Sequence, residues 1–403
     1  MNTTWQEQLD RIVDSRFEQL VAIRRHLHMN PEPSGEEQET SLFLYQKLGD
    51  EGFEVRMGPE GCGVLADMPA CDQEANTRLV ALRGDIDGLF IHDAKQVIYR
   101  SQREGVMHGC GHDGHTAIIF GALSAIHELQ RTGSAPWPLA VRGIFQPAEE
   151  TVSGAKEMIG VGALKGVQAI MACHVDPTLP VGRIGVRPGV LTASCDQVDF
   201  MIVGRGGHAA RPHETSDPIA AAAQLINSLY LFIPRVTDSQ DAVVITIGTL
   251  SGGVNANVIP ETVALGGTVR TLDPEVRRET FEHIQRLSVG ISQTTDTEIQ
   301  VTFGQGCGSI ENDAPLVDLF SRAAHEVLGP DGVAMIPRAS MGSEDFAFYL
   351  EHVPGAMFRL GCKSERAGGA ALHSPFFDMD EEALRIGAKI LARAAVHRSC
   401  PEV

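Results

Sequence analysis

The sequence is poor in basic charge. It contains 33 Lys and Arg residues against 52 Asp and Glu residues, which gives a formal net charge of -19 at pH 7. Phosphate backbones and anionic membrane surfaces attract clustered positive charge, so this deficit argues against nucleic acid or a membrane as the partner. The acidic balance mainly promotes solubility.

Two kinds of apolar segment are also lacking. The opening stretch, MNTTWQEQLDRIVDSRFEQL, carries charges throughout and has no apolar core of the kind that a signal peptide needs. We expect no later run to reach the length of about 20 apolar residues that spans a bilayer. These absences predict a cytoplasmic protein without a membrane partner.

Cysteine is too sparse for a disulfide scaffold, and its spacing lacks the pairs of a zinc ribbon. We expect reduced thiols at all eight positions, which are Cys62, Cys71, Cys110, Cys173, Cys195, Cys307, Cys362 and Cys400. The G-x-S-x-G nucleophile elbow is absent as well, which argues against a serine hydrolase of that kind.

The length of 403 residues favours two domains over one. After one long amino-terminal helix that ends at NPEPSGEE, the apolar runs RLVAL, LAVRGIF and VQAIMA each precede a polar cluster and alternate with helical segments. This alternation predicts an α/β catalytic domain with a mixed, mainly parallel sheet flanked by helices. Ligands of such sheets collect at the carboxyl ends of the strands.

The pattern changes at about Val186 to strand, helix, strand, strand, helix and strand. This order predicts an inserted ferredoxin-like α+β domain. The α/β pattern resumes at APLVDLFSRAAHEVLG. We therefore assign residues 1–186 and 304–403 to the catalytic domain and residues 187–303 to the insertion.

The stretch MHGCGHDGHT concentrates potential metal ligands. Cys110 and His112 can face one point, because alternate residues of an extended or looped segment share a side. A thiolate and an imidazole at this spacing make a good pair for a divalent metal. We expect Asp113 to cap the helix that follows, and His108 and His115 to make supporting hydrogen bonds. The alternative is a glycine-rich turn with incidental histidines.

Further candidate ligands follow apolar runs elsewhere. Glu149 and Glu150 come after LAVRGIF, where one carboxylate could bind a metal while its neighbour faces a metal-bound water, although two adjacent glutamates are more often a solvated surface feature. His174 and His373 are each weak signals on their own. Together, five candidate ligands exceed the three or four that one zinc ion takes from a protein. Two metals that share a bridging ligand account for them.

The motifs then match a known family. RRHLHMNPEPSGEE, RGDIDG, MHGCGHDGHT, FQPAEE, CHVDP, GRGGHAARPHETSDPI, GGVNANVIP, GTVRTLD, MGSEDFA and LHSP occur in this order over nearly the whole chain. The sequence resembles the two-metal amidohydrolases of the aminoacylase and glutamate-carboxypeptidase superfamily. Within it, the sequence is similar to the branch of hippurate hydrolase, auxin-conjugate hydrolases and N-acetyl-diaminopimelate deacetylase.

The resemblance implies roles for particular residues. The implied metal ligands are the bridging Cys110 with His112, Glu150, His174 and His373. Glu149 matches the general acid/base, and Asp87 matches an aspartate that orients a metal-ligand side chain. His208 of the inserted lid domain matches a histidine that reaches the partner subunit's site and donates to the reacting carbonyl. Asn257 and Arg270 match positions that bind the substrate carboxylate.

The implied reaction is hydrolysis of the amide bond of an N-acyl or N-aroyl amino acid by a metal-bridged hydroxide, with Glu149 as the general acid/base. The cofactors would be two divalent ions per subunit, with zinc or manganese expected and cobalt or nickel compatible with the mixed ligands. The resemblance also implies a homodimer formed through the lid domain. The alternatives are a cysteine-nucleophile hydrolase, a non-catalytic metal- or ligand-binding homologue, and a peptidase that acts on small dipeptides.

Overall fold

The computed structural model describes residues 3–69 and 78–401, and these form two compact units. The first unit contains the chain up to Gly189, Glu311–Pro337 and the chain from Asp345 onward. The second contains Val190–Ile310 and Arg338–Glu344. The chain crosses between units three residues after the expected position near 186 and seven residues after the expected position near 303, and the short return at Arg338–Glu344 had no counterpart in the sequence prediction.

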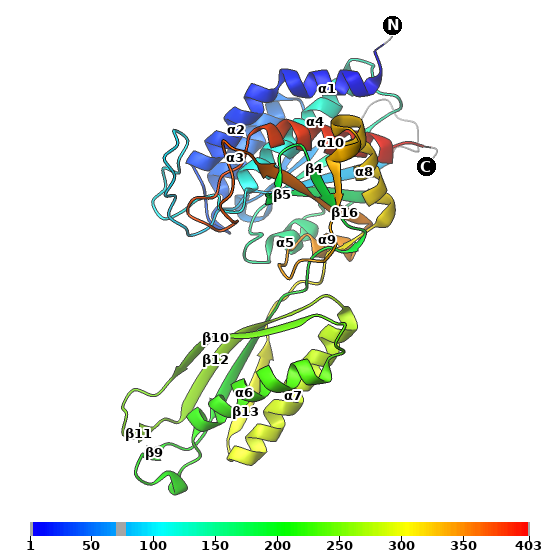
Figure 1. The fold of residues 1–403 in the computed structure, drawn as a ribbon. Coiled ribbons are helices and arrows are strands. Elements are labelled where there is room, and N and C mark those ends of the chain that lie inside the picture. The colour runs from blue at the N-terminus through cyan, green and yellow to red at the C-terminus, as the bar shows by residue number, and fades with distance from the viewer. Residues whose placement is uncertain (1–2, 70–77, 402–403) are drawn as a thin grey trace. The chain divides into compact units, whose positions relative to one another are not determined.

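The first unit is built on an eight-stranded mixed sheet in the order β1-β2-β4-β3-β5-β16-β6-β15. Figure 1 labels β4, β5 and β16 of this sheet. The strands are β1 Glu54–Met57, β2 Val64–Asp67, β3 Leu79–Asp85, β4 Ala140–Gln146, β5 Val167–Pro180, β6 Ile184–Val186, β15 Val333–Met335 and β16 Gly355–Lys363. The central strands β4, β3, β5 and β16 are parallel to one another. Strand β2 pairs antiparallel with both β1 and β4, and β6 pairs antiparallel with β16 and parallel with β15. This mixed, mainly parallel sheet confirms the predicted fold class.

Helices surround this sheet. They are α1 Trp5–Ser15, α2 Phe17–Met29, α3 Gln38–Asp50, α4 His112–Arg131, α5 Gly154–Gly160, α8 Ala314–Leu328, α9 Ala347–Leu350 and α10 Glu382–Arg398. The amino-terminal helix predicted as one element is two, because the chain leaves helical geometry at Arg16, which has φ -98° and ψ 2°. Strands β3, β4 and β5 correspond to the three predicted apolar runs.

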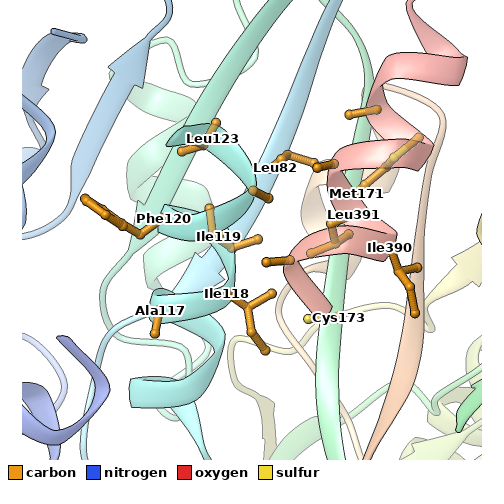
Figure 2. Packing of buried hydrophobic residues seen from close by; sticks show 14 of the residues in the cluster. Leu82, Ala117, Ile118, Ile119, Phe120, Leu123, Met171, Cys173, Ile390 and Leu391 are labelled. Atoms are coloured by element: carbon orange, nitrogen blue, oxygen red, sulfur yellow. The ribbon is translucent and has the colours of Figure 1, made fainter. Parts of the chain in front are cut away.

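The core of the first unit lies between α4, α10 and the sheet. Figure 2 labels Ile118 and Leu123 of α4, Leu82 of β3, Met171 of β5 and Leu391 of α10 among the residues of this core, and all five are fully buried. Burial of each such side chain contributes about 1.5 to 3 kcal/mol. This packing fixes α4 over the strands and so fixes the place where its first turn meets their carboxyl ends.

The second unit has a four-stranded antiparallel sheet in the order β10-β12-β8-β13, with two helices packed against it (Figure 1). Its elements are β8 Asp196–Val203, β9 Gly207–His208, α6 Pro218–Val236, β10 Val243–Gly252, β11 Val258–Ile259, β12 Thr262–Thr271, α7 Pro274–Thr295 and β13 Glu298–Phe303. The larger elements follow the predicted ferredoxin-like order, and β9 pairs with β11 as an added ribbon. The short strands β7 Gly189–Val190 and β14 Glu311–Asn312 complete the described strands.

One helix of the described chain, α6, is long and apolar enough to cross a membrane, by length and composition only. The expectation that no run reaches that length was therefore wrong for this segment. Helix α6 buries Ala221, Leu225, Leu229 and Ile233 in the core of the second unit. An apolar core face of this kind raises the hydropathy of a helix without any membrane.

Candidate metal centre

The loop before α4 carries two of the predicted metal ligands. Helix α4 begins at His112, and Gly111 precedes it with φ +86°. A Cβ at Gly111 would lie 2.4 Å from Val175 Cγ2, so both the backbone conformation and the space require glycine. This close approach brings Cys110 and His112 against β5 at Val175.

Asp113 does not cap α4, contrary to the sequence prediction. The residue before the helix is Gly111, and no side chain caps that end. The Asp113 carboxylate instead accepts a hydrogen bond from Arg24 Nε at 2.9 Å and lies 2.8 Å from His28 Nδ1. Asp113 therefore joins α4 to α2, because a buried charge needs a charged partner more than the helix end needs a cap.

The orientations of two candidate histidine ligands are fixed through their Nδ1 atoms. His112 Nδ1 lies 3.0 Å from both the carbonyl oxygen and Oδ1 of Asp87, and His174 Nδ1 lies 2.7 Å from the carbonyl oxygen of Val175. An Nδ1 that donates to an oxygen leaves Nε2 with a lone pair. The His112 Nε2 atom is buried and has no hydrogen-bond partner within residues 3–69 and 78–401. Burial also holds the pKa of His174 well below its usual range, which keeps that ring neutral.

The structure brings all five predicted ligands together in two groups that share Cys110. One group contains Cys110, His112 and His174, and the other contains Cys110, Glu150 and His373. The donor atoms of each group lie within 4.8 Å of one another, and Cys110 Sγ is 3.5 Å from His174 Nε2. Convergence of an unpaired imidazole nitrogen, a thiol and a carboxylate fits divalent metal ions, and Cys110 belongs to both groups.

The turn after β4 carries Glu149 and Glu150 in a strained conformation. Ala148 has φ +51° and Val152 has φ +59°, although neither is glycine. Strain of this kind is found at functional sites where surrounding structure holds it. Glu149 Oε2 lies 3.9 Å from His112 Nε2, so the carboxylate expected to act as general acid/base borders the ligand cluster.

Asp87 connects these two elements. Its Oδ1 lies 3.0 Å from His112 Nδ1, and its Oδ2 accepts from the Glu150 backbone N–H at 3.0 Å and from Ser34 Oγ at 2.7 Å. A carboxylate in this position orients the His112 imidazole by holding its Nδ1 atom. Residues that contact the ligands in this way tune metal sites.

His373 completes the second group from the distant end of the chain. Its φ is +62°, its backbone N–H donates to the Gly109 carbonyl at 2.8 Å, and its Nε2 lies 3.3 Å from Glu150 Oε1. Hydrogen bonding with Cys110 and Glu150 raises the pKa of His373 to about 10. Binding of a divalent cation to this group would therefore release a proton.

A network of buried hydrogen bonds lies beside the ligands, and the sequence predicted only the part made by His115. His115 Nδ1 lies 2.7 Å from Asp85 Oδ1, and His115 Nε2 accepts from the Val175 N–H at 2.9 Å, so the predicted supporting role of His115 is confirmed. Arg83 Nη1 donates to Asp85 Oδ2 at 2.8 Å. The prediction was wrong for His108, because neither of its ring nitrogens has a hydrogen-bond partner within the described ranges.

The other predicted residues belong to the second unit. His208 lies on β9 and Asn257 in the turn before β11, and both are exposed. Arg270 lies on β12 and donates from Nη1 to the Met341 carbonyl at 3.0 Å and to Ser343 Oγ at 3.3 Å. These three residues are not part of the cluster in the first unit.

The cysteines among the described residues are all free thiols. Cys71 lies outside the described residues. Burial raises the pKa of the Cys62 thiol to about 11 and that of the Cys362 thiol to about 12, which makes both poor nucleophiles at neutral pH.

Comparison with known proteins agrees with this geometry. Residues 81–397 match the peptidase family M20/M25/M40. The chain is 37% identical to N-acetyl-L-cysteine deacetylase of Bacillus subtilis over 91% of its own length and 85% of the relative. It is 34% identical to IAA-amino acid hydrolase ILR1-like 2 of Arabidopsis thaliana over 94% of its own length and 85% of the relative.

Among solved structures, the fold is similar to that of the YXEP protein of Bacillus subtilis, described as a dinuclear metal binding peptidase from the M20 family. The TM-score is 0.81 at 34% sequence identity, and the match covers 96% of this chain and 99% of the other.

Proposed function

Because the chain belongs to the peptidase family M20/M25/M40, we propose that it hydrolyses the amide bond of N-acyl or N-aroyl amino acids and releases a carboxylic acid and an amino acid. The observation that carries this proposal is the convergence of five donor side chains into two groups that share Cys110, with Glu149 beside them. The relatives whose names describe deacetylation and amino acid conjugate hydrolysis support the substrate class.

Two divalent ions at such a site would lower the pKa of a water molecule and polarise the amide carbonyl. The remaining chemistry belongs to the protein. Glu149 accepts a proton from the attacking water and passes it to the leaving amine, since its carboxylate lies at the edge of the ligand cluster. The ions would be held by Cys110, His112, Glu150, His174 and His373. Asp87 fixes the ring of His112.

We assign His208 to stabilisation of the reacting carbonyl, acting from a partner subunit. Its Nδ1 accepts from the Ala210 N–H at 3.1 Å, so the neutral ring carries its proton on Nε2, where it can be donated to an oxyanion. We assign Asn257 and Arg270 to the substrate carboxylate. Arg270 uses one guanidinium nitrogen within its own unit and has further N–H groups for an anion.

Zinc or manganese is the expected metal, and cobalt or nickel would suit the same mixed ligands. We further propose a homodimer that forms through the second unit. Strand β10 lies at an edge of its sheet and exposes Val244 and Leu250, and an unpaired edge of this kind invites pairing with another chain. The free thiols of the described cysteines are in keeping with a cytoplasmic location.

The decisive experiment compares Glu149→Gln with Glu150→Gln. Glu149→Gln should retain two bound metals while kcat for an N-acetyl amino acid falls by about 100-fold or more, because only the proton-transfer group is lost. Glu150→Gln should instead lose metal, because a ligand carboxylate is removed. Near-normal turnover by Glu149→Gln would disprove its assignment.

A substrate and metal panel tests the alternatives. Activity on N-acetyl, N-benzoyl and long-chain N-acyl amino acids, and on small dipeptides, separates an aminoacylase from a dipeptidase. Chelator treatment should abolish activity, and added manganese or zinc should restore it. Activity that survives chelation would favour a cysteine nucleophile, and metal binding without turnover of any substrate would favour a non-catalytic homologue.

A further inference from the structure

The turn between α2 and α3 contains a buried carboxyl group that the reaction above does not use. Glu37 immediately precedes α3, and its side chain is fully buried. Its Oε1 accepts a hydrogen bond from the Ala148 backbone N–H at 2.8 Å, across 111 positions of sequence. Its Oε2 has no hydrogen-bond partner within residues 3–69 and 78–401. The hydrogen bond to Ala148 therefore joins this side chain to the turn that carries Glu149.

That contact is made at a strained point. Ala148 has φ +51°, a conformation that costs a residue with a Cβ about 1 to 3 kcal/mol unless its surroundings hold it. The carbonyl of the same residue accepts from the N–H groups of Ser153 at 3.3 Å and Gly154 at 3.2 Å. Ala148 is thus held from both sides, by Glu37 at its nitrogen and by the start of α5 at its oxygen.

The turn between α2 and α3 also contacts Asp87, which binds the backbone of Glu150. Ser34 Oγ donates to Asp87 Oδ2 at 2.7 Å, and that oxygen accepts from the Glu150 N–H at 3.0 Å. Ser34 and Glu37 therefore act on the two residues that flank Glu149. Since neither contact includes a metal-ligand side chain, the turn controls the backbone around Glu149 more directly than it controls the ligands.

Helix capping does not account for the Glu37 side chain. The residue occupies the N-cap position of α3, but its side chain makes no capping hydrogen bond there. Its backbone carbonyl accepts from the N–H of Ser41 at 2.9 Å and from Ser41 Oγ at 2.6 Å, contacts that any residue could provide. A buried carboxyl with one satisfied oxygen is costly, so a side chain placed there for packing alone would be better apolar.

We propose that Glu37 is a positioning residue for Glu149, and that it acts by accepting the Ala148 N–H and holding the left-handed turn before the catalytic carboxylate. The inference rests on the proposed function, since it assigns Glu149 the proton transfer. The geometry assigns the role to the oxygen acceptor and not to the negative charge. Burial and the nearby Asp87 raise the pKa of Glu37 to about 7, and the protonated acid can still accept at one oxygen.

The test uses two small substitutions that separate the acceptor from the charge. Glu37→Gln keeps the length of the side chain and an oxygen acceptor but removes the charge. Glu37→Asp keeps the charge but shortens the reach to the Ala148 N–H. The matched controls are Glu36→Gln and Glu36→Asp, because the neighbouring Glu36 carboxylate is exposed and pairs with Arg103 at 2.7 Å. Each metal-loaded variant is assayed for metal content, kcat and KM, and for amide hydrogen exchange in residues 145–153.

We expect kcat of Glu37→Gln to stay within about 3-fold of the wild-type value, and kcat of Glu37→Asp to fall by about 10-fold or more with little change in KM. Metal content should stay at the wild-type level in both variants. Amide exchange in residues 145–153 should accelerate only in Glu37→Asp, because only that variant releases the Ala148 N–H. Both Glu36 variants should match the wild type.

Three results would overturn the proposal. They are wild-type kcat and exchange in Glu37→Asp, equal damage in both Glu37 variants, and loss of metal from Glu37→Asp. The last would mean that Glu37 supports the ligands and not Glu149. If the wild-type protein hydrolysed none of the amides, the proposed function would fail, while the exchange comparison would still decide whether Glu37 holds the Ala148 turn.

Discussion

At the scale of single residues, the direction of two histidine ligands is fixed by a hydrogen bond at the ring nitrogen that does not face the ligand cluster. His112 and His174 are useful as ligands because their Nδ1 atoms are occupied, by Asp87 and by the Val175 carbonyl, which directs both Nε2 atoms toward Cys110. The backbone before Glu149 is also held by hydrogen bonds. Glu37 accepts from the Ala148 N–H, and the Ala148 carbonyl accepts from the N–H groups of Ser153 and Gly154. The chemistry of each residue can be read from its type, but its direction depends on a partner far away in sequence.

Glu37 also makes stability depend on pH in the metal-free protein. Its pKa rises from an ordinary value near 4.5 to about 7 on folding, so between these values the folded state retains a proton that the unfolded state has released. Stability is therefore lost as pH rises from about 4.5 to about 7. Glu37→Gln removes this loss. In urea unfolding of the metal-free proteins, its stability relative to wild type should be higher at pH 7.5 than at pH 4.5, by roughly 3 kcal/mol. A difference that is independent of pH would contradict the shifted pKa.

At the scale of elements, buried charges join helices that lie far apart in the sequence. Arg24 of α2 is fully buried and donates to Asp113 of α4 at 2.9 Å and to Asp378 at 2.6 Å. These two carboxylates hold the pKa of the Arg24 guanidinium well above its usual range, although burial acts in the opposite direction. The amino end of α4, which carries His112, is thereby held against α2.

Removal of the Arg24 cation should strongly lower the free energy of unfolding. Arg24→Met leaves Asp113 and Asp378 buried without their main partner, which should cost about 3 to 5 kcal/mol of unfolding free energy. The neighbouring Arg25 provides the control, because it is about a third exposed and forms its ion pair with the partly exposed Glu381. Arg25→Met should cost about 1 kcal/mol or less. Denaturant unfolding measures the loss of unfolding free energy in both variants. Equal losses would show that burial of Arg24 adds nothing to the stabilisation by its ion pairs.

At the scale of the whole molecule, the chain contains two units with separate cores. One core lies between α4, α10 and the large sheet, and the other lies between α6, α7 and the four-stranded sheet. The proposed ligands and Glu149 all belong to the first unit, whereas His208, Asn257 and Arg270 belong to the second. The proposed function therefore needs both units, although each could be recognised from its own pattern of strands and helices.

The proposed dimer can be tested at the edge of the second unit. Val244→Lys combined with Leu250→Lys places two charges on the exposed positions of β10, and charges on an edge strand oppose pairing. Sedimentation velocity should give a dimer for the wild type and a monomer for the double variant. Val161→Lys, at an exposed position of the first unit, should leave the dimer intact. A wild-type monomer at micromolar concentration would refute the proposed dimer.

The sequence by itself determined the local chemistry of this protein. Apolar runs that alternate with helical segments predicted the strands that lead to the site, because a buried parallel strand needs a continuous apolar run. The close spacing of Cys110 and His112, and the motif order, predicted the ligand set that the structure brings together. The insertion was visible because its order of strands and helices differs from that of the flanking sequence.

Only the tertiary structure decided which residues support that chemistry. Asp113 pairs with Arg24 instead of capping α4, His108 lacks the hydrogen bonds expected of it within the described ranges, and Glu37 reaches Ala148 across 111 positions. No local pattern encodes these contacts, because each depends on where two distant segments meet once the core has formed. Buried polar groups take the partners that packing provides, and those partners fix the direction in which each ligand points.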